Sequence, residues 1–298
     1  MSLAIAAVVL NHRTADDTIL AVRSLKASDT GVHIIVVDNG SADDSLARLR
    51  QIPGVDVIEL RHNLGFSAGC NAGIERALAA GAGAVLLINS DVIVPPDAIG
   101  ALSAVLAQDR SVGIVGPVVR QRSSPDVIES AGIRYDLTTG RMRLIEHRVS
   151  TTALPPFAVR AVDAVSGCAM LVRREVFEAV GRLEADYYFG FEDLDFCLRA
   201  RQRGFNTACC GSAFVLHEGH RSIGRQSARR TYYATRNHLL LAARHPLDRT
   251  RWQRRVRLMR VLALNLAYAI KGEDVPRLHG VYNALAGAMD FMRGRAGR

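Results

Sequence analysis

Three acidic side chains, Glu192, Asp193 and Asp195, fall within four positions, between Phe191 and Phe196. A carboxylate in a partly apolar setting binds its proton more tightly than in water, which suits a general base that works near neutral pH. On a helix, Glu192 and Asp195 share a face, whereas Asp193 points elsewhere. Acids also stabilise helix starts through the helix dipole, so a structural role for this cluster is the alternative.

Two other aspartates, Asp38 and Asp91, come at or just after the ends of predicted strands. In an open parallel sheet such strand ends share the edge where ligands bind. Asp38 can accept hydrogen bonds from a base or ribose there, or it can cap the next helix. Asp91 is costly to bury unless it is paired or binds a cation, and a turn before Pro95 is its structural alternative. A cation that bridges two phosphates requires only one or two protein carboxylates.

Residues 63–71 are rich in glycine and open a predicted helix, a setting in which the backbone can approach phosphate closely. The segment lacks the GxGxxG spacing of dinucleotide-binding folds, which argues against hydride transfer. His217 ends the last predicted strand, and it can either complete a metal site or serve a structural role.

The elements that must position these residues alternate along the first 120 residues. Continuous apolar strands separated by helices predict a mostly parallel sheet that is covered by helices on both faces. Strands are expected over residues 4–10, 33–38, 55–60, 84–89 and 112–119, and helices over residues 14–27, 43–51, 67–80 and 96–108.

The rest of the chain is less regular. Residues 120–157 lose periodicity, which predicts a long excursion that is either a hairpin or a loop. We expect strands over residues 161–173 and 206–217, and helices over residues 174–180 and 192–202. From Ser227 the chain is predicted to be helical and basic, with a break at Pro246.

Composition limits the class of protein. Hydrophobic residues make up 49% and charged residues 22%, which predicts a folded globular chain. The five cysteines form no CxxC pair, so we expect a reducing compartment without disulfides or a zinc site. The apolar run over residues 261–270 has about half the ~20 residues of a spanning helix, and we expect no transmembrane segment.

The net charge of +9 is concentrated at one end, because residues 221–298 carry 17 Lys and Arg against four Asp and Glu. A basic tail on a mildly acidic body indicates an anionic partner, either nucleic acid or a membrane surface. A solvated helical face is the alternative.

Taken together and in order, these segments resemble family 2 of the inverting glycosyltransferases, closest to the bacterial rhamnosyltransferase-like branch. The resemblance covers roughly residues 4–241. It rests on residues 8–11, 37–41 and 63–66, Asn71, residues 89–91, 166–169 and 192–195, His217 through Gly219 to Ser222, and Arg236-Asn237.

The resemblance implies a GT-A fold, with a nucleotide-sugar-binding half over residues 1–120, an acceptor-binding half over 121–222 and a helical basic region over 223–298. It also implies that Asn11 and Asp38 contact the nucleoside. The implied donor site further includes Asn63, Gly65, Asn71, Ser90 and Arg236.

The resemblance assigns the chemistry to Asp193 as the base and to Asp91 as the ligand of Mg²⁺ or Mn²⁺ on the donor diphosphate, with His217 as a further ligand. Asn89 replaces the first acid of the family's DxD motif. The implied acceptor side comprises Gly167, Cys168 and Glu192, and Cys168 departs from the small alanine more usual there.

The implied reaction moves a sugar from a nucleoside-diphosphate donor, dTDP-rhamnose or a UDP-sugar, to a saccharide or lipid-linked acceptor in cell-surface polysaccharide synthesis. A sugar nucleotidyltransferase is the first rival, but residues 11–14 lack its basic glycine-rich loop. A non-catalytic nucleotide-sugar-binding protein is the second, and the complete series of carboxylates argues against it.

The basic tail combines six arginines over residues 249–260 with Trp252 and an apolar run, as an interfacial helix requires. We therefore expect a cytoplasmic protein that binds the inner face of the cell membrane peripherally and has no nucleic-acid partner. Packing of the tail on the body or on a second copy in a homodimer is the alternative.

Overall fold

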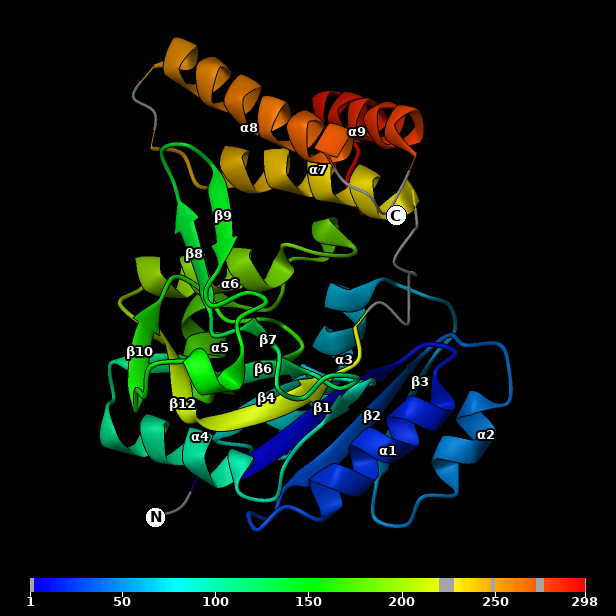
Figure 1. Ribbon diagram of the computed structural model, residues 1–298. Coiled ribbons are helices and arrows are strands. Elements are labelled where there is room, and N and C mark those ends of the chain that lie inside the picture. The colour runs from blue at the N-terminus through cyan, green and yellow to red at the C-terminus, as the bar shows by residue number, and fades with distance from the viewer. Residues whose placement is uncertain (1–2, 220–227, 248–249, 272–275, 298) are drawn as a thin grey trace.

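The computed structural model describes residues 3–219, 228–247, 250–271 and 276–297. A ten-stranded, mostly parallel sheet forms the centre, in the order β10-β12-β6-β11-β4-β1-β2-β3, with β5 on β12 and β7 on β6 (Figure 1). Its strands are β1 (Ile5–Asn11), β2 (His33–Asn39), β3 (Asp56–Leu60), β4 (Ala84–Asn89), β5 (Val92–Ile93), β6 (Val112–Gln121), β7 (Ile128–Ser130), β10 (Val159–Val162), β11 (Ala169–Arg173) and β12 (Asn206–His217).

Alternating residues of the strands pack against different helices, because successive side chains of a strand point to opposite faces. Val8 and Val37 belong to one core with helices α3, α5 and α6, and Ala7 and Val36 belong to the other with α1, α2 and α4. These helices are α1 (Ala15–Lys26), α2 (Ser45–Arg50), α3 (Phe66–Ala79), α4 (Ala98–Gln108), α5 (Arg174–Val180) and α6 (Glu192–Gln202). The predicted parallel sheet with helices on both faces is therefore confirmed.

The strand predicted over residues 161–173 is wrong, because the chain forms two strands there. β10 pairs antiparallel with β12 at the sheet edge, whereas β11 lies between β4 and β6 in the centre. The segment from Asp163 to Cys168 crosses between these places, and Ser166 and Gly167 interrupt the apolar run. Apolar character alone does not indicate which neighbours a strand has, so this interruption did not reveal that the two strands lie in different places of the sheet.

The excursion over residues 120–157 contains a two-stranded hairpin, β8 (Ile133–Asp136) and β9 (Arg141–Leu144), and a short 3₁₀ turn at Thr151–Ala153. The hairpin reaches toward the C-terminal helices in Figure 1. The proposed halves meet in a single sheet, since β11 from residues 121–222 is inserted between two strands of residues 1–120.

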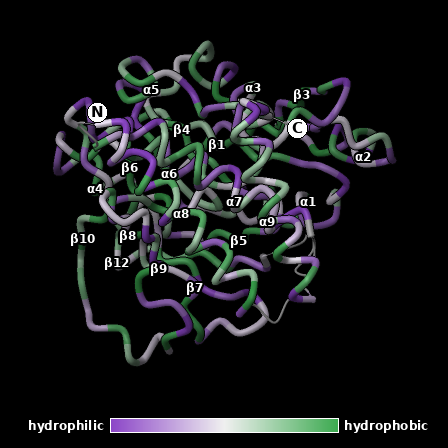
Figure 2. Tube along the Cα trace, turned by 90° about the horizontal axis from the view of Figure 1, so that it is seen from above, coloured by the Kyte–Doolittle hydropathy of each residue, from purple (hydrophilic) through white to green (hydrophobic). Residues whose placement is uncertain are grey.

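Three helices, α7 (Ala228–Arg244), α8 (Arg251–Lys271) and α9 (Arg277–Met292), pack together over the face that carries α3, α5 and α6. Seen from above, they lie over the middle of the molecule (Figure 2). The expected break at Pro246 separates α7 from α8, and a further break not predicted from the sequence precedes α9. Within the described ranges, no helix is both long and apolar enough to cross a bilayer.

Candidate active site

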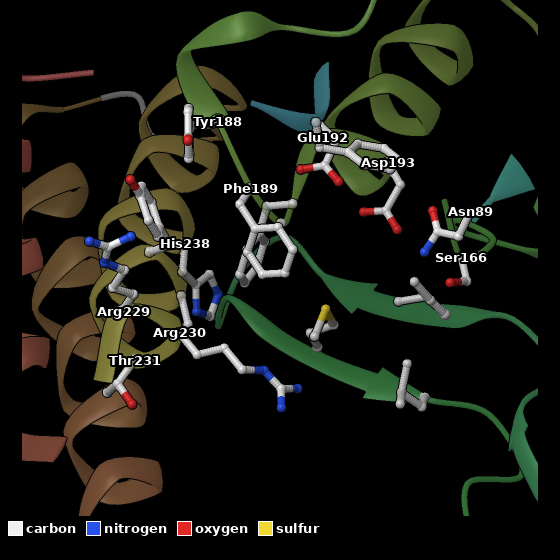
Figure 3. A pocket seen from close by; sticks show the side chains of 18 of the residues that line it. Asn89, Ser166, Tyr188, Phe189, Glu192, Asp193, Arg229, Arg230, Thr231 and His238 are labelled. Atoms are coloured by element: carbon white, nitrogen blue, oxygen red, sulfur yellow. The ribbon is translucent and has the colours of Figure 1, made fainter. Parts of the chain in front are cut away.

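A cavity of about 1400 Å³ lies between the carboxyl ends of the central strands, the β8–β9 hairpin and the first turns of α7. Seven of the thirteen predicted site residues line it: Asn63, Gly65, Ser90, Asp91, Glu192, Asp193 and His217. In Figure 3, Asn89, Ser166, Glu192 and Asp193 lie at one end, and Arg229, Arg230 and Thr231 of α7 lie at the other.

Asp91 and His217 are brought together by the short strand β5. Val92 pairs with His217 in the antiparallel β5–β12 ladder, which places the preceding Asp91 beside the imidazole. Asp91 Oδ1 lies 3.4 Å from His217 Nε2, and the other ring nitrogen, Nδ1, lies 2.9 Å from Oε2 of Glu129. Glu129 is the middle residue of the short strand β7. Its place in the site was not predicted, because the sequence around it shows no periodic pattern.

Three neighbouring groups oppose the effect of burial on this histidine. Burial alone lowers the pKa of His217, but the neighbouring Cys168, Asp91 and Glu129 raise it, and the balance is a pKa of about 11. Burial raises the pKa of Asp91, and the hydrogen bond and charge of His217 outweigh this and hold it below its ordinary value. The two shifts thus favour the charged forms of His217 and Asp91.

Asp193 lies in the first turn of α6, where the chain enters through Phe191 with a left-handed φ of 75°. Its Oδ2 accepts a hydrogen bond of 2.8 Å from the Gly167 backbone N–H, and its Oδ1 accepts one of 2.8 Å from Leu194 N–H. A Cβ at Gly167 would lie 3.2 Å from the Asp193 side chain, so the absence of a side chain there permits this contact. Burial raises the pKa of Asp193 despite these two donors.

Glu192, directly before the candidate base, is 7% exposed, and its Oε2 has no hydrogen-bond partner. Burial and the adjacent Asp193 raise the pKa of Glu192 to about 8. Asp195, the third acid of the cluster, points away from the cavity and contacts His245 at 2.9 Å and Arg199 at 2.7 Å. The cluster thus divides into two cavity acids with raised pKa values and one acid that anchors α6.

Asp38 and Asn11 occupy the ends of β2 and β1, where they are in register. Asn11 Nδ2 donates a hydrogen bond of 2.7 Å to Asp38 Oδ1, and Asn11 Oδ1 accepts one of 2.8 Å from Thr18. Asp38 also accepts a hydrogen bond from Ser41 Oγ at 2.5 Å. Both residues are buried beneath the cavity and outside its lining, so they hold the loop after β2 in place.

The glycine-rich segment joins the cavity wall through Asn63 and Gly65. Asn63 Oδ1 accepts hydrogen bonds from Gly65 N–H at 2.8 Å and from Asn39 Nδ2 at 3.2 Å. Gly65 has a φ of 87°, and a Cβ there would lie 2.5 Å from the ring of Tyr188. Only glycine allows this turn and the close approach of Tyr188, which itself lines the cavity.

Four predicted site residues besides Asn11 and Asp38 lie outside the cavity lining. The Asn71 side chain donates a hydrogen bond of 2.8 Å to the Leu183 carbonyl and accepts one of 3.1 Å from the Leu183 N–H. Arg236 is 1% exposed, and its guanidinium donates to the carbonyls of Asp186, Tyr187 and Gly297. Gly167 contacts the site only through Asp193, and Cys168 packs in the core on the opposite face of the sheet. Ser222, part of the sequence resemblance, lies outside the described residues.

The structure adds Tyr188 and several residues of α7 that the sequence did not single out, and it shows what Phe191 contacts. Tyr188 stacks on Tyr233 with centroids 5.3 Å apart, and Phe191 stacks on His238 at 5.1 Å. The side chain of Arg230 extends from α7 into the cavity (Figure 3). The sequence showed that this C-terminal region is rich in basic residues, but only the fold shows which of them face the cavity.

Comparison with known proteins gives consistent results. Residues 6–237 match a family model described as "Glycosyltransferase like family 2". The N-acetylglucosaminyl-diphospho-decaprenol L-rhamnosyltransferase of Mycobacterium tuberculosis is 30% identical over 241 residues, covering 74% of this chain and 77% of that protein. The dTDP-rhamnosyl transferase RfbF of Shigella flexneri is 25% identical over 221 residues, 70% of each chain.

The fold also matches solved structures. The mannosyltransferase PcManGT from Pyrobaculum calidifontis, in complex with GDP-Man and Mn²⁺, aligns over 99% of this chain and 88% of that chain with a TM-score of 0.62. The sequence identity in that alignment is 15%, so the likeness concerns the fold alone.

Proposed function

The chain belongs to glycosyltransferase family 2 and has the GT-A fold, and on this premise we propose that it transfers a sugar with inversion from a nucleoside-diphosphate donor, with Asp193 as the base. The observation that carries this proposal is the position of Asp193. Its carboxylate borders the cavity, two backbone N–H groups fix its orientation, and burial raises its pKa.

An acceptor hydroxyl is a poor nucleophile until its proton is removed. A carboxylate whose pKa is raised by burial removes that proton more effectively than a solvated one. In the proposed reaction, Asp193 accepts the proton as the acceptor oxygen bonds to the anomeric carbon and the bond from that carbon to the donor phosphate breaks. Attack from the side opposite the leaving diphosphate inverts the anomeric centre, and no covalent sugar–enzyme bond forms.

The proposed donor site lies at the strand ends, with Asn63, Gly65 and Ser90 in the cavity wall. Asn11 and Asp38 support this wall from below, so we propose that they act on the nucleoside by holding the loop after β2. Asn71 and Arg236 are left out of the proposed donor contacts, because their polar groups bind backbone atoms away from the cavity.

The residues at the strand ends fit a divalent cation of the kind that binds a diphosphate. Asn89 Oδ1 is buried without a hydrogen-bond partner, and Asp91 and His217 line the same cavity. Within the described part of the chain no three His, Cys, Asp or Glu side chains converge on one point, so the protein offers an open set of ligands. Mg²⁺ and Mn²⁺ accept such sets, since substrate phosphates complete their coordination.

We propose Asp91 and His217 as the protein ligands, with Glu129 orienting the imidazole through Nδ1, an arrangement common behind metal-binding histidines. A divalent cation bound there would neutralise charge that gathers on the leaving diphosphate.

The proposed donor is dTDP-rhamnose, with UDP-sugars as the alternative, because the relatives named above are rhamnosyltransferases. The proposed acceptor is a lipid-linked saccharide, the class named for the Mycobacterium tuberculosis relative. Cell-surface polysaccharide synthesis is the process that such a reaction would serve.

Replacement of Asp193 by Asn tests the proposal. The amide retains the shape of the side chain but accepts no proton, so transfer should fall by about 10²–10⁴-fold. Donor binding, measured as a thermal shift with dTDP-rhamnose and UDP-sugars, should persist. The same substitution at the exposed Asp29, outside the cavity, is the matched control.

Undiminished transfer by D193N would exclude Asp193 as the base. Binding of donors without any transfer by the wild-type chain, tested over a panel of lipid-linked acceptors, would favour a non-catalytic binding protein. Formation of a nucleotide-sugar from a sugar phosphate and a nucleoside triphosphate would favour a nucleotidyltransferase.

A further inference from the structure

Exposed apolar side chains are concentrated on the two outermost helices. Among the described residues, ten of the fourteen exposed large hydrophobic side chains belong to α8 and α9. Exposed apolar side chains gathered on neighbouring elements of a folded protein often mark an interaction site. These helices form the layer farthest from the central sheet (Figure 1).

On α8, the exposed apolar residues follow a helical stripe. Trp252 is 72% exposed, Met259 65% and Ile270 49%, and Val256 and Ala263 lie between them at helical spacing. The opposite side of α8 packs in the small core with α7 and α9 through Val261. The stripe on α8 therefore points away from the body of the protein.

A second stripe runs along α9 with steps of three and four residues. Its members are all exposed, by between 44% and 86% of their surface: Leu278, Tyr282, Leu285, Met289 and Met292. The small residues Gly280, Ala284, Gly287 and Ala288 form the buried side, and a Cβ at Gly287 would lie 2.4 Å from the Tyr232 carbonyl of α7. Both stripes thus face outward, and together we call them the α8–α9 face.

The charges beside the apolar stripes are almost all positive. Arg251, Arg254, Arg255 and Arg260 are exposed on α8, and none of them has an ion-pair partner among the described residues. Arg255 and Arg260 border a shallow groove whose floor includes Trp252 and Met259. α8 contains no acidic residue, and the only acid within α9, Asp290, already binds Tyr232, Arg293 and Arg295.

This charge pattern distinguishes two occupants of the α8–α9 face. A second copy of the chain would bring unpaired arginines against one another, and removing such charges from water without partners is costly. The surface of an anionic bilayer supplies negative headgroups for the arginines and an apolar interior for the tryptophan, methionine and leucine side chains.

The cavity of the proposed active site extends to this same layer. Leu264, Asn265 and Tyr268 of α8 line it, and Tyr268 is 69% exposed. Asn265 also contacts His238 at 2.9 Å, and His238 stacks on Phe191 at the start of α6. One end of α8 therefore lies beside the cavity.

We propose that the α8–α9 face binds the surface of an anionic lipid bilayer and thereby places the cavity at that surface. The identity of the acceptor as a lipid-linked saccharide rests on the function proposed above, whereas the proposed membrane binding by the α8–α9 face does not. The membrane contact inferred from the basic tail is here assigned to two helices, of which α9 contributes apolar area and α8 most of the charge.

The test is co-sedimentation of the full chain, without donor or acceptor, with vesicles of phosphatidylcholine alone or with about 30% phosphatidylglycerol. The wild-type chain should bind the anionic vesicles at least about tenfold more tightly than the neutral ones, with a strong decrease at high salt. Two arginines near a surface account for about a 30-fold change in partitioning, so R255Q/R260Q should weaken binding by that factor. W252S/L278S should weaken it about tenfold by removing inserted apolar area.

The matched control is R23Q/R110Q, which removes two exposed arginines, one on α1 and one just after α4, and should bind within twofold of wild type. Helices α1 and α4 cover the face of the sheet that lies away from α8 and α9. All four replaced residues of the α8–α9 face are exposed, so these variants should fold, which circular dichroism verifies. Equal binding of all variants, or no preference for anionic vesicles, overturns the proposal. It is also overturned if wild type is dimeric by analytical ultracentrifugation and W252S/L278S is monomeric.

Failure of the proposed function gives a different result. D193N should bind vesicles like wild type, because binding requires no catalysis. If the chain binds vesicles through the α8–α9 face but transfers no sugar, the proposed membrane binding is supported and the proposed glycosyl transfer is refuted.

Discussion

Replacement of Glu192 by Gln should change the pH dependence of stability. Glu192 is buried beside Asp193, its Oε2 has no hydrogen-bond partner, and burial is the main reason that its pKa rises from the ordinary 4.5 to about 8. Because the folded state holds this proton and the unfolded state releases it, the stabilising contribution is complete below about pH 4.5. It is then lost as the pH rises through 8.

The magnitude follows from the two pKa values. At about 1.4 kcal/mol for each tenfold change in proton affinity, the interval from 4.5 to about 8 corresponds to roughly 5 kcal/mol of stability lost with rising pH. The amide of the E192Q variant does not titrate, so this variant should gain about 3 kcal/mol relative to wild type between about pH 5 and pH 8. At the acidic end the amide donor lacks a partner, and the variant should be about 1 kcal/mol less stable.

The measurement is urea unfolding at several pH values, followed by far-UV circular dichroism. The single tryptophan, Trp252, is 72% exposed and would report poorly on the core. E175Q, at an exposed position of α5, provides the baseline for the same chemical change in solvent. If the difference between E192Q and wild type does not vary with pH, the raised pKa and the argument from burial are refuted.

Two further predictions concern Arg236 and the divalent cation. R236K should lower the stability by about 2–4 kcal/mol, because lysine lacks the planar fork that binds three carbonyls, while the donor affinity of the folded protein stays unchanged. Thermal denaturation with and without donor measures the stability and the donor affinity. A large loss of donor affinity at unchanged stability would indicate that Arg236 contacts the donor after all. Removal of divalent cations by a chelator should abolish transfer, and added Mg²⁺ or Mn²⁺ should restore it. The D91N variant should require a higher metal concentration than wild type for half-maximal activity. Full activity in excess chelator would contradict the proposed role of Asp91 and His217.

The family and the type of fold could be predicted from the sequence, because they depend on local patterns. Continuous apolar runs such as residues 33–38 and 84–89 require burial on both faces, and the helical segments between them supply the cover. The order of short polar motifs also assigned Asp91 and Asp193 to one active site, Asp91 at a strand end and Asp193 at a helix start. Both line the same cavity in the structure.

The pairing of strands could not be predicted, because it depends on contacts between distant segments. An apolar run shows that residues 161–173 are buried, but it does not show that the chain leaves the sheet edge at Val162 and re-enters between β4 and β6. The same limit hid Glu129, which approaches His217 only because β7 pairs with β6 beside β12.

Residue type alone did not distinguish a polar group that faces the cavity from one that supports the fold. Asn63 and Asn71 lie in one segment, yet Asn63 lines the cavity and Asn71 binds the backbone of Leu183. Arg230 and Arg236 lie on the same helix, and only Arg230 points into the cavity. The sequence by itself determined which chemical groups this protein carries and that buried strands present them at a sheet edge. Tertiary structure decided which of them meet, because a helix or strand end is oriented by packing with segments far away in the chain.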